Sequence, residues 1–267
     1  MNRIESTFRR LRANNEKALV GFVTAGDPDM EKSLSLVSSM CAAGLDMLEL
    51  GVPFSDPTAD GPIIQRSSLR ALAAGINVGS VLEMIAALRP QSQVPIIVFS
   101  YYNPLLAYGA AVFHRDALDA GADGVLVVDL PPEESDEFTR EWPDERLCLI
   151  RLTTPATSLE RMEQITSSAS GFIYHVSKLG VTGSAGLQFD EINLKVKALR
   201  SLTRLPVCVG FGISTPQHIA SVAEMADGVV VGSAFESLIE QNVGREGLSD
   251  LLSARVAAFK RATLALS

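Results

Sequence analysis

An acidic residue interrupts an apolar stretch in the segment LELGVPFSDPTADGP at residues 48–62. Glu49 lies between two leucines, and Asp60 follows eleven positions later, beyond a loop that Pro53 and Pro57 stiffen. A buried carboxylate is costly unless something compensates it, so such a residue is either satisfied by the following loop or kept for chemistry. Apolar neighbours would raise the pKa of Glu49 and keep its proton available near neutral pH. The two acids therefore form a candidate acid–base pair.

Each of these carboxylates also has a purely structural interpretation. Glu49 could accept hydrogen bonds from backbone amides of the loop that follows it. Asp60 could cap a helix that has Pro62 in its first turn, because aspartate is common at this position. The sequence alone leaves both interpretations open beside the catalytic one.

Three glycine clusters near the end of the chain indicate a phosphate site. They are GVTGSAG at 180–186, GFG at 210–212 and GSA at 232–234, and each follows an apolar run. Glycines let backbone N–H groups approach an anion, and a short helix starting near Ser233 would add the positive end of its dipole. The predicted phosphate-binding residues are Gly183, Gly210, Phe211, Gly212, Gly232 and Ser233.

The elements that must position these residues repeat along the chain. Eight apolar, β-branched runs alternate with amphipathic helical patterns, and they lie at 18–26, 46–54, 94–102, 124–132, 146–154, 171–180, 205–214 and 228–235. Extra helices are expected at the N-terminus, after the second strand and at the C-terminus. The pattern predicts one α/β domain over residues 1–267, a (β/α)8 TIM barrel, with an open doubly wound sheet as the alternative.

Composition excludes several classes of protein. The 267 residues carry a formal net charge of −8, which argues against a nucleic-acid or acidic-membrane partner. Three scattered cysteines and three histidines without metal-ligand spacing indicate neither a disulfide framework nor a metal site. No signal peptide is visible, and no apolar run reaches the roughly 18 residues of a membrane span, so a cytoplasmic protein is expected.

Together these motifs resemble the α subunit family of tryptophan synthase, an indole-3-glycerol-phosphate lyase. The segment at 48–65 matches the family signature almost throughout. The similarity continues in order through YYNP (101–104), DLPPEES (129–135), GFIYHVS (171–177), GVTG (180–183), PVCVGFGIS (206–214) and GVVVGSAF (228–235). It therefore covers nearly the whole chain.

The resemblance implies a role for each matching residue. Glu49 resembles the acid that protonates the indole ring at C3, and Asp60 the carboxylate that balances positive charge on the indole N–H. Thr182, in the loop after the sixth strand, resembles the residue that bonds Asp60 when the loop closes. The residues implied around the indole are Phe22, Ile64, Phe99, Tyr101, Leu126 and Tyr174. This retro-aldol cleavage of indole-3-glycerol phosphate needs no metal or organic cofactor.

The resemblance also implies a partner, a β subunit that carries pyridoxal phosphate and consumes the indole in an αββα complex. The implied contact residues are Pro53, Asp56, Pro57, Asn103 and Pro104. The sequence departs from the common family pattern at Thr58, at Phe99-Ser100 and at Val128, positions around the indole pocket and the partner surface. Neither carboxylate is affected by these departures.

Other functions compete with this interpretation. Lys178 follows the sixth strand, where a desolvated lysine could form a Schiff base with a carbonyl substrate. A barrel that binds phosphate and merely activates a partner is a second alternative, and a stand-alone lyase that releases free indole is a third. The presence of both Glu49 and Asp60 favours a catalytic chain over the non-catalytic alternative.

Overall fold

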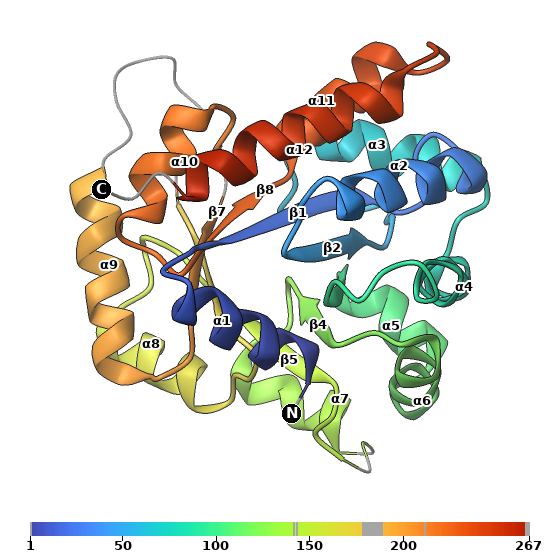
Figure 1. Cartoon of the computed structure of the whole chain (residues 1–267). Helices are drawn as coiled ribbons and strands as arrows, with labels where there is room; N and C mark the ends of the chain where they lie inside the picture. The colour runs from blue at the N-terminus through green and yellow to red at the C-terminus, as the bar shows by residue number, and fades with distance from the viewer. Residues whose placement is uncertain (1, 141, 143, 178–188, 211, 265–267) are drawn as a thin grey trace.

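A closed barrel forms the centre of the protein. The structure is a computed structural model, and it describes all residues except 1, 141, 143, 178–188, 211 and 265–267. Within the described residues, eight parallel strands follow one another in chain order, and β1 pairs with β8 to complete the ring (Figure 1). The strands are β1 (Ala18–Thr24), β2 (Met47–Gly51), β3 (Ile96–Ser100), β4 (Gly124–Val127), β5 (Cys148–Thr153), β6 (Ile173–Val176), β7 (Val207–Gly210) and β8 (Gly228–Val231). The closed ring confirms the predicted TIM barrel and rules out the open sheet.

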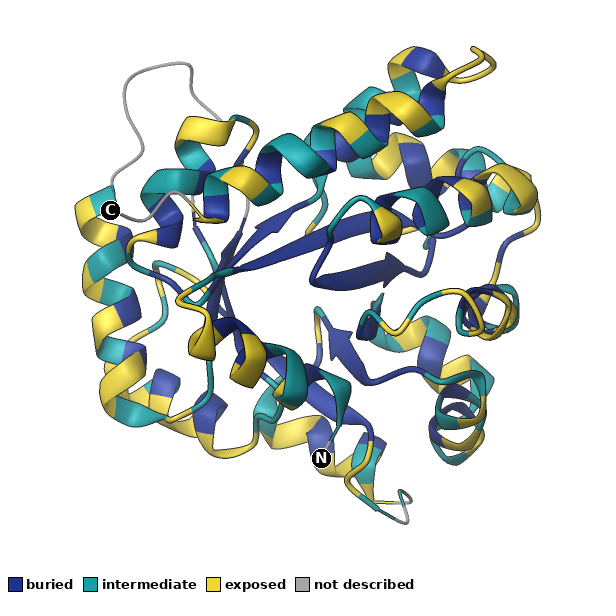
Figure 2. Cartoon of the chain, in the orientation of Figure 1, coloured by how far each residue is buried: buried dark blue, intermediate teal, exposed yellow. Residues whose placement is uncertain are grey.

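The strands are buried on both faces, which explains their almost continuous apolar sequences (Figure 2). Inward side chains such as Val20, Met47 and Ile97 fill the barrel, whereas outward ones such as Leu19 and Leu48 pack beneath the helices. The alternation of the two sets along each strand determines which residues face the interior.

Helices cover the outside of the barrel (Figure 1). They are α1 (Arg3–Ala13), α2 (Met30–Ala42), α3 (Pro62–Ala73), α4 (Val78–Leu88), α5 (Tyr102–Tyr108), α6 (Ala110–Ala120), the 3₁₀ turn η1 (Pro132–Glu134), α7 (Ser135–Thr139), α8 (Leu159–Ser167), α9 (Phe189–Leu202), α10 (Pro216–Ala223), α11 (Ser233–Asn242) and α12 (Leu248–Leu264). Among the described residues no single helix could span a membrane, although α3 and α4, bent by 92° at their junction, together pass the same test of length and composition.

The three predicted extra helices are α1, α4 and α12. Helix α1 covers the amino-terminal end of the barrel, where Ile4, Phe8 and Leu11 join the interior cluster. Helix α12 packs on the outside against α2, α10 and α11. The eighth strand, predicted to extend to residue 235, ends at Val231, because the chain turns at Gly232 into helix α11.

A repeated contact fixes the strands at the amino-terminal end of the barrel. Each even-numbered strand is preceded by a polar side chain that accepts a backbone N–H near the start of the strand before it. The pairs are Leu19 N–H to Asp46 (2.9 Å), Ile96 N–H to Asp123 (2.9 Å), Leu149 N–H to Ser170 (2.8 Å) and Val207 N–H to Asp227 (3.0 Å). Each aspartate also pairs with a cation, as Asp123 does with Arg89 at 3.0 Å. We call these four contacts the floor contacts.

Candidate active site

Glu49 lies inside the barrel, near the carboxyl end of β2. It is in register with Phe22 of β1 and Ile97 of β3, and its side chain is fully buried. Neither carboxyl oxygen has a hydrogen-bond partner among the described residues. Burial alone raises the pKa of Glu49 to about 8. The described part of the following loop therefore does not satisfy this acid, and a proton is held on it at neutral pH.

Asp60 occupies the loop that joins β2 to α3, and it does not cap the helix. The N-cap of α3 is Gly61, which makes no side-chain capping bond, and Pro62 takes the first helical position. Burial raises the pKa of Asp60 to about 6, while a hydrogen bond from Tyr101 acts in the opposite direction. The Tyr101 hydroxyl also accepts the Ala59 N–H at 2.9 Å. Asp60 is thus held by Tyr101 and ionises more readily than Glu49.

An apolar wall surrounds the buried acid. The rings of Phe22 and Phe99 meet edge to face with their centroids 5.0 Å apart. Leu126 is in register with Phe99 and is fully buried. Tyr174 is 8 % exposed, and burial together with the neighbouring Glu49 raises the pKa of its hydroxyl. Ile64 lies half-buried in the first turn of α3.

The strand-end glycines lie beside this wall. Gly210 closes β7 in register with Val230 of β8, so the ends of the two strands are neighbours. A Cβ on Gly210 would lie 2.5 Å from the Tyr174 hydroxyl, and one on Gly232 would lie 3.2 Å from the Phe22 ring. The backbone is therefore close to the aromatic side chains at both positions. Gly232 is also the N-cap of α11, so the first amides of that helix begin at Ser233.

The structure does not bring every predicted residue together. Thr182, Gly183, Phe211 and the alternative Lys178 lie outside the described residues. Gly212 is exposed and has a φ of +75°, a conformation that favours glycine. Of the predicted contact residues, Asp56 and Asn103 are exposed, Pro57 and Pro104 are half-buried, and Pro53 is buried.

The sequence did not predict one buried acid near these residues. Glu236, on α11, is fully buried and accepts the Thr24 N–H at 2.5 Å. Asp27 and Arg70 lie beside it and are paired with each other. Helical spacing could have indicated its burial, because Glu236 lies three positions before the apolar Ile239 and shares one face of the helix with it.

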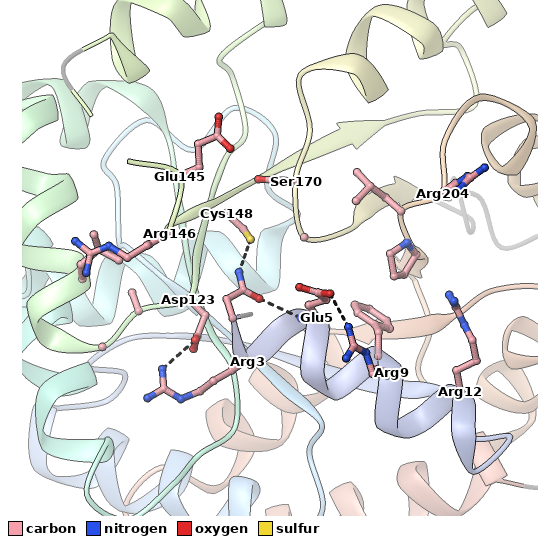
Figure 3. A pocket seen from close by; sticks show the side chains of 18 residues that line it. Arg3, Glu5, Arg9, Arg12, Asp123, Glu145, Arg146, Cys148, Ser170 and Arg204 are labelled. Atoms are coloured by element: carbon pink, nitrogen blue, oxygen red, sulfur yellow. Dashed lines mark hydrogen bonds and ion pairs between the residues drawn. The ribbon is translucent and has the colours of Figure 1, made fainter. Parts of the chain in front are cut away.

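A groove lined by residues of α1 lies at the opposite end of the barrel, and Figure 3 shows its lining side chains. It has a volume of about 1160 Å³ and lies beneath α1, beside Ala122, Gly171 and Pro206, which precede β4, β6 and β7. Parallel barrels carry their reactive groups at the carboxyl ends of the strands, so this groove is separate from the Glu49 site. No cluster of three or more potential metal ligands occurs among the described residues.

Comparison with known proteins agrees with this architecture. Residues 8–263 match the model of the family described as tryptophan synthase alpha chain. The tryptophan synthase alpha chains of Desulfatibacillum aliphaticivorans and Desulfosudis oleivorans are 56% and 57% identical to this chain, each over 98% of it and 99% of the relative.

Solved structures agree as well. The crystal structure of tryptophan synthase subunit alpha from Legionella pneumophila superposes with a TM-score of 0.91 at 40% identity, covering 100% of both chains. A chain of Mycobacterium tuberculosis tryptophan synthase gives a TM-score of 0.89 at 32% identity over 98% of each chain. The chain therefore belongs to the tryptophan synthase alpha chain family, a lyase family of tryptophan biosynthesis.

Proposed function

We propose that this chain cleaves indole-3-glycerol phosphate to indole and glyceraldehyde 3-phosphate by acid–base catalysis. The observation that supports this most strongly is Glu49, a fully buried carboxyl group without a hydrogen-bond partner in the described structure, inside the barrel near the strand ends. Its pKa near 8 keeps a proton on the acid at neutral pH, as a general acid requires.

In the proposed reaction Glu49 gives one proton to the substrate and takes one proton back from it. Glu49 donates its proton to C3 of the indole ring, and Asp60 in its ionised form balances the positive charge that develops at the ring N–H. The bond between C3 and the hydroxyl-bearing side-chain carbon then breaks, and its electrons return to the indole. The Glu49 carboxylate takes the hydroxyl proton as the aldehyde forms, which restores the acid. The pKa values of about 8 and about 6 suit these two roles.

The surrounding residues have binding roles in this proposal. Phe22, Ile64, Phe99, Tyr101, Leu126 and Tyr174 hold the indole, and their low exposure keeps water from the ring. The phosphate binds to backbone amides at Gly210, Gly212, Gly232 and Ser233, where α11 directs its positive end. The sequence motif assigns Gly183 and Phe211 to the phosphate site as well, and it assigns to Thr182 a hydrogen bond with Asp60.

We also propose the form of the complex. Membership of an alpha chain family implies a β subunit partner, and we infer an αββα tetramer in the cytoplasm, with pyridoxal phosphate in the β subunit. Asp56, Pro57, Asn103 and Pro104 are exposed or half-buried and form the contact surface. Pro53, which is buried, shapes the loop from within.

The test is indole release from indole-3-glycerol phosphate, measured with and without a β subunit. Glu49→Gln and Asp60→Asn should each reduce the rate at least a hundredfold while the far-UV spectrum stays unchanged. Glu83→Gln, which makes the same chemical change on an exposed residue of α4, serves as the control and should retain full activity. Full activity of Glu49→Gln would refute the acid–base assignment, and no stimulation by the β subunit would favour a stand-alone lyase.

A further inference from the structure

The first turn of α11 is tied to the end of β1 by a single buried acid, Glu236. We propose that Glu236 is a positioning residue that holds the amino-terminal end of α11, and with it the phosphate site, against the end of β1. This inference rests on the proposed function, because Gly232 and Ser233 are the phosphate-binding residues it would place. It adds a residue that does not itself touch substrate.

The contact with β1 is direct. Glu236 is the fourth residue of α11, three positions after Ser233. One of its carboxyl oxygens accepts the Thr24 N–H at 2.5 Å, at the last residue of β1. Phe22 lies two residues earlier on the same strand, beside both Glu49 and Gly232. A shift of α11 would therefore change the distance between the phosphate site and the indole wall.

The contact with α3 runs through a charged cluster. Arg70 of α3 donates two hydrogen bonds of 2.7 Å to Asp27 and one of 2.9 Å to Glu240 of α11. Arg66 donates two more to Glu240, at 2.7 and 2.8 Å. Glu236 and Glu240 lie one helical turn apart, so α11 is held to β1 through the first acid and to α3 through the second. Helix α3 begins directly after the loop that carries Asp60.

The charges of this cluster balance without Glu236. Arg66 and Arg70 neutralise Asp27 and Glu240, and the second Glu236 oxygen has no hydrogen-bond partner among the described residues. Burial and the nearby Asp27 carboxylate raise the pKa of Glu236. The protonated acid is therefore the form that fits at neutral pH. Ionisation would add an uncompensated charge that repels the Asp27 carboxylate, and this repulsion would displace the first turn of α11.

Amide and leucine substitutions separate this role from simple packing. Glu236→Gln keeps an oxygen for the Thr24 N–H and supplies an N–H toward Asp27, so it imitates the protonated acid. Glu236→Leu removes the acceptor of the Thr24 N–H and the polar group beside Asp27 at similar volume. Ser237→Ala, on the same helix, is the control. Inorganic sulfate is a suitable probe of the phosphate site, because its charge does not change between about pH 6 and 10.

We expect Glu236→Leu to weaken sulfate binding about tenfold and to raise KM for indole-3-glycerol phosphate more than it lowers kcat. In the wild-type protein, sulfate binding should weaken at alkaline pH as Glu236 ionises. The Glu236→Gln variant should bind sulfate as the wild type does at neutral pH and lose less affinity at alkaline pH, where only the ionisation of Glu49 remains. The Ser237→Ala protein should match the wild type throughout.

Two results would overturn the inference: sulfate affinity and KM unchanged in Glu236→Leu, or identical pH dependence of binding in wild type and Glu236→Gln. The second comparison decides the question even if the leucine variant does not fold. Absence of lyase activity in the wild-type protein would instead refute the proposed function. The two failures are therefore distinguishable.

Discussion

Phe22 and Glu49 are register partners in the pairing of β1 with β2, so the ring and the carboxyl group project side by side into the barrel. The same ring contacts Phe99 and lies close to the backbone at Gly232. One aromatic side chain thus borders both the acid and the glycine end of β8. This arrangement sets the acid at a fixed spacing from the proposed phosphate site.

The two carboxyl groups predict a bell-shaped dependence of kcat/KM on pH. Asp60 must be ionised and Glu49 protonated, so activity should fall below about pH 6 and above about pH 8. Initial rates of indole release across this range measure both limits. Asp60→Asn should lower the rate and abolish the acidic limb while keeping the alkaline one. A profile that rises through pH 8 would contradict the assignment of Glu49 as the acid.

Tyr101 should control the acidic limb of this profile. Its hydrogen bond lowers the pKa of Asp60, so Tyr101→Phe should move that limb to higher pH by about half a unit to one unit. Tyr102→Phe is the matched control, since the neighbouring ring packs on Phe138. The measurement is kcat/KM against pH for the three proteins. An acidic limb that stays in place or moves to lower pH would show that Tyr101 does not act on Asp60.

Glu49→Gln should stabilise the protein, and increasingly so as the pH rises. The pKa of Glu49 is about 8 in the fold against an ordinary 4.5, so the folded wild type retains a proton that the unfolded chain has lost. Wild-type stability therefore falls between about pH 4.5 and 8, by about 2–4 kcal/mol from this group. The difference in thermal midpoint between variant and wild type, compared at pH 5 and pH 8, measures it. Glu236 contributes equally to both proteins, and an equal difference at the two pH values would contradict the prediction.

Gly210 and Gly61 should respond differently to alanine. A methyl group on Gly210 would lie 2.5 Å from the Tyr174 hydroxyl and 2.7 Å from the Val230 Cβ, so Gly210→Ala should cost about 1–3 kcal/mol of unfolding free energy. Gly61 has a φ of −73° and open space around it, so the entropic gain of Gly61→Ala offsets the poorer N-cap and the change should be nearly neutral, within about 0.5 kcal/mol. Urea unfolding of both variants tests this contrast. Equal stability of the two variants would mean that the end of β7 relaxes around the methyl group.

Much of the site follows from local sequence. A single acid in an apolar parallel strand is conspicuous, and the rule that reactive groups lie at strand ends is enough to assign Glu49 to the mouth of the barrel. The glycines that follow β7 and β8 are found in the same way. Barrel closure cannot be derived from the strand pattern, because the same alternation of strands and helices also builds an open sheet.

Contacts between distant residues are beyond the sequence pattern. Thr24 and Glu236 are 212 positions apart, and nothing local to either residue indicates that they meet. The bond from Tyr101 to Asp60 depends likewise on where the β2–α3 loop folds back over β3. The strand predicted over 94–102 ends at Ser100, and helix α5 begins at Tyr102. The sequence did not predict this helix, because its first residue continues the apolar run of the strand.

The floor contacts have a consequence for how this barrel can change. They join β1 to β2, β3 to β4, β5 to β6 and β7 to β8 at the end of the barrel away from Glu49. The register of these strand pairs is therefore fixed at the end opposite the candidate active site. Loops at the mouth can then lengthen, shorten or be exchanged without letting a strand slip. The loops that bind substrate can therefore change while the floor contacts and the strand register stay the same.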